Sequence, residues 1–181
     1  MLSHGKYSDL TSEQYELLGR AFIEWSNIEF LLGILLSRLL FTPEFLGRTY
    51  SDEMTASKLE SAIKNALDIH KKRYSESIIT ETQHEKITQV LVKAASCRTL
   101  RNKFAHYVWM RRSDEEIYGA KMSGKLPKAN KSNGSMIISL NQLKENYSTA
   151  HLLVEDLQKI IFDIPSVKEE RNLTKKINVD I

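Results

Sequence analysis

The hydrophobic pattern begins with one long helical stripe near the start of the chain. Thr11 and Gln14 have the spacing of a capping box, so a helix is predicted from about Thr11 to Phe41. Apolar residues recur at steps of three and four along it: Leu18, Phe22, Trp25, Ile28, Leu32, Leu35, Leu36 and Leu39. From Ile28 onward the helix is apolar almost all round, which predicts cover on more than one side. A second copy of the chain is the expected source of the extra cover.

The rest of the chain predicts three further helices and a small β insertion. The segment TPEFLG, with Pro43 and Gly47, predicts a turn. Helical periodicity then predicts helices over 54–74, from about 82 to 104, and from 141 until Pro165. Residues 107–140, between the last two of these helices, predict a small β-hairpin with a long mobile loop. This segment contains the β-prone YVWM, the mixed stretch 116–122, a loop-forming stretch and the apolar MIISL.

These elements predict a mainly all-α fold. We expect a bundle of four to five helices, with the hairpin inserted after the third long helix. Residues 1–164 are predicted to form one domain, followed by a polar, poorly ordered tail over 165–181. Only 7 Gly and 3 Pro occur among 181 residues, too few for a β-sandwich with a turn every ten residues.

Several features predict a cytoplasmic location without a membrane span. The single cysteine, Cys97, has no disulfide partner within the chain. The first sixteen residues are polar and acidic, unlike a secretory signal. The longest apolar stretch, 28–41, contains Glu29, Ser37 and Arg38 and is shorter than the roughly 20 residues that a membrane helix needs.

The positive charge is concentrated in the second half of the chain. The formal net charge is only +3, from 26 Lys and Arg against 23 Asp and Glu. The segment from Arg101 to Lys131, however, contains eight basic and three acidic residues, whereas residues 9–41 contain five acidic and two basic residues. This distribution is compatible with a phosphate backbone beside Arg101, although the Lys121 to Lys131 part is equally well explained as a solvated loop.

The basic region begins at a cluster of residues suited to phosphate chemistry. Arg101, Asn102 and His106 lie near the end of the third long predicted helix, in RTLRNKFAHYVWM. Five residues at 100° each place Arg101 about 140° from His106, so one rigid helix does not aim both at one atom. Either the helix frays before His106, or the two residues meet across a two-fold axis between identical helices.

Cleavage of RNA without metal needs these residue types. One group takes the 2′-OH proton, another protonates the leaving 5′ oxygen, and a cation stabilises the charge that develops on phosphorus. His106 is predicted to be the base or the acid, and Arg101 to bind the phosphorane oxygens. Asn102 is expected to orient His106 or a phosphate oxygen.

With these three residues the chain resembles the HEPN family, whose motif is R-x(4-6)-H, often with Asn directly after the Arg, at the end of a core helix. The resemblance implies an all-α, usually dimeric protein. Many members are metal-independent endoribonucleases of toxin-antitoxin and defence systems, so a homodimer, an RNA substrate and an antitoxin protein are the implied partners. Members often carry an acidic residue from another helix near the motif, and here Glu24 or Glu29 would fill that role.

Two alternatives stay open at this point. Arg101 and Asn102 would otherwise be surface or capping groups, with His106 compensating the helix C-terminus. The function would then be that of a non-catalytic helical module that binds RNA or a protein of a toxin-antitoxin or defence system.

Residues around the motif complete the predicted RNA site: Arg98, Lys103, Tyr107, Arg111 and Arg112. Arg98 either touches RNA or pairs with Glu24 or Glu29, and Tyr107 or Trp109 would stack on a base. The other histidines have no metal-ligand spacing and no Gly-rich phosphate loop occurs, so neither a metal nor a cofactor is expected.

Overall fold

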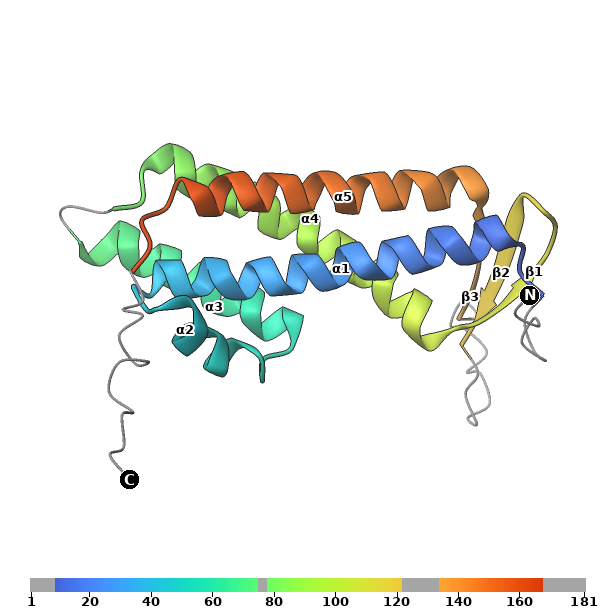
Figure 1. The fold of residues 1–181 in the computed structure, drawn as a ribbon, viewed down its shortest axis with the longest axis horizontal. Coiled ribbons are helices and arrows are strands. Elements are labelled where there is room, and N and C mark those ends of the chain that lie inside the picture. Colours follow the sequence, from blue (N-terminus) through green and yellow to red (C-terminus); the bar gives the residue numbers. More distant parts are fainter. Residues whose placement is uncertain (1–8, 75–77, 122–133, 168–181) are drawn as a thin grey trace, which may run out of the picture. The chain divides into compact units, whose positions relative to one another are not determined.

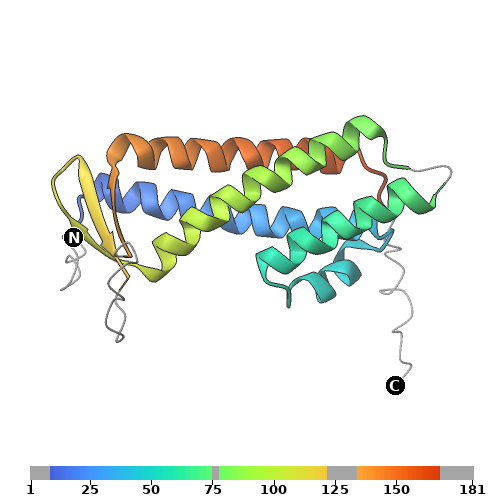
Figure 2. The same cartoon turned by 180° about the vertical axis from the view of Figure 1, so that it is seen from behind.

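The computed structural model describes residues 9–74, 78–121 and 134–167. Helices account for 72% of this part of the chain, which confirms the mainly α fold class. The elements are α1 (Ser12–Leu39), α2 (Glu44–Ser51), α3 (Ala56–Arg73), α4 (Glu81–His106), β1 (Val108–Arg111), β2 (Glu116–Ala120), β3 (Ser135–Ser139) and α5 (Leu140–Phe162). Figures 1 and 2 show their order along the chain from opposite sides.

The chain divides into two compact units, and each draws on both halves of the sequence. The first unit comprises Met1–Ile28 and Val90–Asp156, and the second comprises Glu29–Gln89 and Leu157–Ile181. The helices α1, α4 and α5 contribute residues to both. The single domain over 1–164 therefore stays a prediction, and the tail beyond residue 167 and the loop residues 122–133 lie outside the described residues.

Three of the long helices begin with the same local signal. Thr11 and Gln14, Thr80 and Gln83, and Ser139 and Gln142 each form a reciprocal pair of backbone to side-chain hydrogen bonds at the first turn. Each pair satisfies backbone N–H groups that have no partner within the helix. The capping box predicted at Thr11 is confirmed, and α1 begins directly after it.

In the first unit, a three-stranded sheet packs where α1 and α5 begin (Figures 1 and 2). The strands are antiparallel in the order β1, β2, β3, so the predicted hairpin is extended by a third strand. The MIISL segment supplies that strand before α5 starts. The core here consists of apolar residues from both ends of the unit: Leu10, Leu17, Phe104, Trp109, Ile117, Ile138, Leu140 and Leu143.

A glycine in β2 lies under the larger aromatic ring of this core. Gly119 pairs with Trp109 in the register of β1 and β2. A Cβ at Gly119 would lie 2.5 Å from the Trp109 ring, so the ring packs where only a hydrogen can fit. The Trp109 indole N–H also donates to the carbonyl oxygen of Phe104 at 3.1 Å, which connects the sheet to the last turn of α4.

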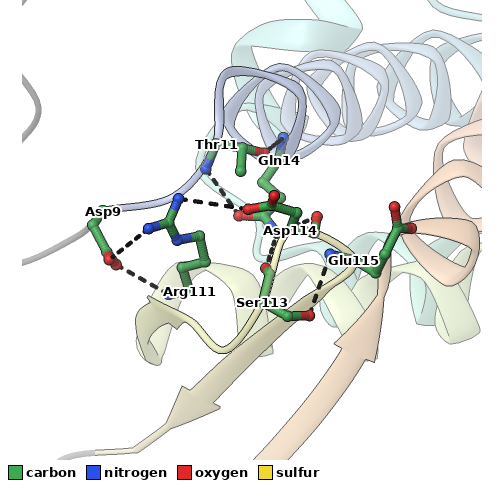
Figure 3. A network of polar contacts seen from close by, with 7 residues as sticks. All are labelled: Asp9, Thr11, Gln14, Arg111, Ser113, Asp114 and Glu115. Carbon is green, nitrogen blue, oxygen red and sulfur yellow. Dashed lines mark hydrogen bonds and ion pairs between the residues drawn. The ribbon is translucent and has the colours of Figure 1, made fainter.

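The buried amide of Gln14 ties α1 to the turn between β1 and β2. Besides its capping contacts, Gln14 Nε2 donates to the carbonyl oxygens of Ser113 and Asp114, both at 2.9 Å. Figure 3 shows this network, in which Arg111 also lies between the carboxylates of Asp9 and Asp114. The Gln14 side chain is fully buried, although Ser113 and Asp114 lie at the surface, so these bonds are partly shielded from water.

Replacing Gln14 by leucine is expected to lower the free energy of unfolding by about 1–3 kcal/mol, because the carbonyl groups of Ser113 and Asp114 lose their donor and the capping contacts at Thr11 are lost as well. The matched control is Gln142→Leu, which removes an equivalent capping box at an exposed position. That variant is expected to lose about 1 kcal/mol or less. Urea denaturation of both proteins measures the difference, and equal losses would contradict the role given to the Ser113 and Asp114 bonds.

In the second unit, the segment predicted as a turn is instead the short helix α2. Pro43 occupies the position before the first helical residue, where its missing N–H and fixed φ are tolerated. Gly47 lies inside α2 because a Cβ there would lie 2.6 Å from Ser37 Cβ of α1. The two residues that predicted a turn, Pro43 and Gly47, are therefore compatible with a helix that packs closely against α1.

The apolar half of α1 is covered within this chain. Six of its residues are buried: Ile28, Leu31, Leu32, Leu35, Leu36 and Leu39. A second copy is therefore not needed to cover them, and Phe30, Leu40 and Phe41 stay partly exposed.

In the described part of the chain no single helix has the length and hydropathy to cross a membrane. Only α1 and α2 taken together have that length and hydropathy, and the two helices are strongly bent relative to each other.

Candidate functional site

The predicted motif lies in the last turns of α4, and the helix is continuous through it. Arg101 is half-buried, whereas Asn102 and His106 are exposed, and His106 is the last residue of α4. The helix therefore does not fray before His106. The geometry that depends on fraying is therefore absent, and the meeting of two helices across an axis stays a prediction.

Arg101 and Asn102 contact each other along the surface of α4. Arg101 Nη1 lies 3.4 Å from Asn102 Oδ1, which is long for a hydrogen bond between side chains. The Nε atom of the same guanidinium is buried instead, and it has no acceptor among the described residues. The arginine thus has an exposed end beside Asn102 and a buried end.

The turn that carries His106 is held by the residues after it. The Tyr107 N–H donates to the Lys103 carbonyl oxygen at 3.0 Å, and the Trp109 indole donates to Phe104. These bonds satisfy carbonyl groups that a helix end leaves without partners. His106 is therefore presented on an ordered turn at the C-terminal end of α4.

The predicted RNA-binding residues fall into two groups. Arg98, Lys103 and Tyr107 are half-buried around the end of α4, and the Tyr107 ring stacks on Trp109 with centroids 5.9 Å apart. Arg111 and Arg112 instead lie on β1 and just after it, where both form ion pairs.

The ion pairs of these two arginines offset part of the basic character predicted there. Arg111 lies 3.6 Å from both Asp9 and Asp114, and Arg112 lies 3.3 Å from Glu116. Exposed pairs of this kind contribute about 0–1 kcal/mol, so a phosphate group would compete with them at little cost.

The Glu24 carboxylate contacts His151 of α5 rather than Arg101, Asn102 or His106. Its carboxylate, only 12% exposed, lies 2.8 Å from His151 Nδ1 of α5, and His151 Nε2 lies 3.7 Å from Glu155. No local pattern predicts this contact, because Glu24 and His151 are 127 residues apart. Glu29, the other acidic candidate, belongs to the second unit.

A pocket of about 100 Å³ opens between α1, α4 and α5 within the first unit. Its lining comes from ten residues: Ala21, Trp25, Ser96, Cys97, Leu100, Arg101, Phe104, Asn146, Thr149 and Ala150. Two of them carry buried N–H groups without an acceptor among the described residues, Trp25 Nε1 and Arg101 Nε. The sequence did not predict this pocket, because residues that are distant along the chain form its walls.

The pocket lining holds cationic and neutral groups but no carboxylate. Burial raises the pKa of the Cys97 thiol, so this side chain stays protonated and uncharged at neutral pH. Across the described residues, no group of three or more His, Cys, Asp and Glu side chains is placed to hold a metal ion.

Comparisons of the chain with protein-family models, with curated proteins and with solved structures found no match.

Proposed function

We propose that the protein is a metal-independent endoribonuclease of HEPN type that cuts RNA at a site built from two copies of the chain. One observation carries the proposal. Arg101, Asn102 and His106 lie at the end of a helix that is continuous through His106, so Arg101 and His106 project about 140° apart. Two identical helices that meet at an axis bring Arg101 of one protomer to His106 of its partner.

The chemistry at such a composite site follows from the side chains. His106 takes the proton of a ribose 2′-OH or protonates the departing 5′ oxygen, and the second copy of His106 supplies the opposite role. Arg101 stabilises the phosphorane through its exposed Nη atoms, where the weak contact with Asn102 is exchanged for a phosphate oxygen. Lys103 and Tyr107 lie beside the same turn, and we expect them to contact the flanking nucleotides.

The proposal predicts cleavage of RNA in the presence of EDTA. Because the 2′ oxygen attacks phosphorus, the products are expected to carry a 2′,3′-cyclic phosphate and a 5′-hydroxyl, which end-group analysis by mass spectrometry identifies. The matched control is the same oligonucleotide with 2′-deoxyribose at the cleavage position, which should stay intact. Absence of cleavage across structured and single-stranded RNA would contradict the enzyme, and RNA binding without cleavage would indicate a binding module.

A further inference from the structure

The pocket between α1, α4 and α5 contains polar groups that the fold leaves without partners. Trp25 is 2% exposed, and its indole N–H has no acceptor among the described residues. The same holds for Arg101 Nε. A buried donor without a partner costs about 1–3 kcal/mol, and two in one pocket are unusual in a folded protein.

The chemistry of the lining selects the kind of group that would satisfy these donors. An indole N–H and a guanidinium only donate hydrogen bonds, so their partner must accept. The guanidinium is positively charged, and no acidic side chain lines the pocket. A partner with several oxygens and a negative charge fits both conditions.

Size and polarity restrict the partner further. The volume of about 100 Å³ lies below the cavity of about 150 Å³ that holds a benzene ring. Phe104 and Ala150 are buried and form apolar walls, whereas Ser96 and Thr149 are exposed and mark the open side. The pocket therefore admits a group of a few heavy atoms from solvent and surrounds it with largely apolar surface.

We propose that this pocket binds a small oxyanion, either free phosphate or a short carboxylate, with Trp25 Nε1 and Arg101 Nε donating to its oxygens. The proposal does not depend on RNA cleavage, although Arg101 takes part in both. An anion bound at Nε leaves the Nη atoms beside Asn102 available. The bound anion would then fix the orientation of the guanidinium at the surface of α4.

The chain offers a direct reporter, because it contains only two tryptophans. Titration of the full chain with inorganic phosphate is followed by the two indole N–H signals in a proton–nitrogen correlation spectrum, which Trp109→Phe assigns. The Trp25 signal is expected to shift downfield and to saturate with a Kd of about 1–10 mM. Acetate tests the carboxylate source, and chloride at equal ionic strength is the control. A Trp25 signal that does not saturate, or that chloride shifts equally, would overturn the proposal.

Variants assign the binding to the two donors. Trp25→Phe keeps an aromatic wall but removes the N–H, and Arg101→Gln removes the charge. Each is expected to weaken phosphate binding about tenfold or more in calorimetry. Lys93→Gln, which removes a charge from the same helix outside the pocket, is expected to bind phosphate as the unmodified protein does. Equal affinities for all three variants would contradict the assignment.

A second measurement needs no variant. Cys97 lines the pocket and is the only cysteine of the chain. Saturating phosphate is expected to slow its alkylation by iodoacetamide several-fold relative to chloride, and unchanged alkylation would count against occupancy of the pocket. His106→Ala separates the two proposals, because it should abolish RNA cleavage while phosphate still binds.

Discussion

His106→Ala is expected to cut RNA about 10²–10⁴-fold more slowly than the unmodified protein, because the cleavage loses its general base or acid. The side chain is exposed at the last position of α4, so its removal creates no cavity and should leave the fold intact. Single-turnover cleavage of a labelled RNA in EDTA measures the effect, with circular dichroism confirming the helical content. Unchanged cleavage would contradict the proposed role of His106.

The matched control is His84→Ala. His84 belongs to the same helix but lies 22 positions before His106, within the second unit. Its replacement is expected to change cleavage less than twofold. A comparable loss in both variants would indicate a general effect on α4 rather than chemistry at His106.

The proposed composite site can be tested by mixing two inactive variants. Arg101→Ala and His106→Ala are each expected to be inactive alone. When they are mixed and allowed to exchange protomers, a mixed dimer joins the intact Arg101 of one protomer to the intact His106 of its partner. After random exchange about half of the dimers hold one intact Arg101 and one intact His106, so the mixture should cleave RNA measurably faster than either variant alone. Full activity is not expected, because the second His106 is missing from these dimers.

A mixture of Arg101→Ala with the double variant Arg101→Ala, His106→Ala provides the control, because no pairing in it contains an intact arginine. If the first mixture stays as inactive as this control although exchange is verified, Arg101 and His106 do not act across two chains.

Gly47→Ala is expected to lower the free energy of unfolding by about 3 kcal/mol, the upper end of the usual cost of overpacking. The added Cβ would lie 2.6 Å from Ser37 Cβ and 2.7 Å from Thr42 Oγ1. Rotation of the Ser37 hydroxyl does not relieve the contact with its Cβ. Either α2 moves away from α1, or it unfolds, and a fall in Tm measured by circular dichroism reports the loss.

Gly19→Ala tests the same substitution where there is room. Gly19 is an exposed residue inside α1, and an added Cβ there meets no other atom within 4 Å. Because alanine is the better helix former, this variant should gain about 0.5–1 kcal/mol. Combining Gly47→Ala with Ser37→Gly is expected to recover part of the lost stability. Equal stabilities of the two alanine variants would contradict the close packing of α2 against α1.

The long helices were predictable because local signals define them. Capping residues such as Thr11 and continuous apolar stripes are read directly from the sequence, and the predicted ends differ from those of α1, α3, α4 and α5 by about two residues. The helix α2 was missed for a tertiary reason. Pro43 and Gly47 predict a turn, and only the packing against Ser37 explains why a glycine occupies a helical position here.

The contacts around the candidate site were predictable only in part. Spacing alone indicated Arg101, Asn102 and His106, because these residues follow one another on a single helix. The ion pair between Arg111 and Asp9 joins positions 102 residues apart and could not be inferred from either neighbourhood. The pocket was missed for the same reason, since Trp25 and Asn146 meet only after three helices have packed.

The hydrogen bonds from Gln14 to the turn between β1 and β2 have a consequence for synthesis on the ribosome. Its acceptor carbonyl groups come 99 and 100 residues later in the chain, and its neighbour Leu17 packs in the same cluster as Ile117 and Leu143. The first half of α1 therefore leaves the ribosome long before its partners exist. During this interval its apolar side chains need a chaperone or transient cover, and a nascent chain stopped before β2 should be recovered mainly as aggregate.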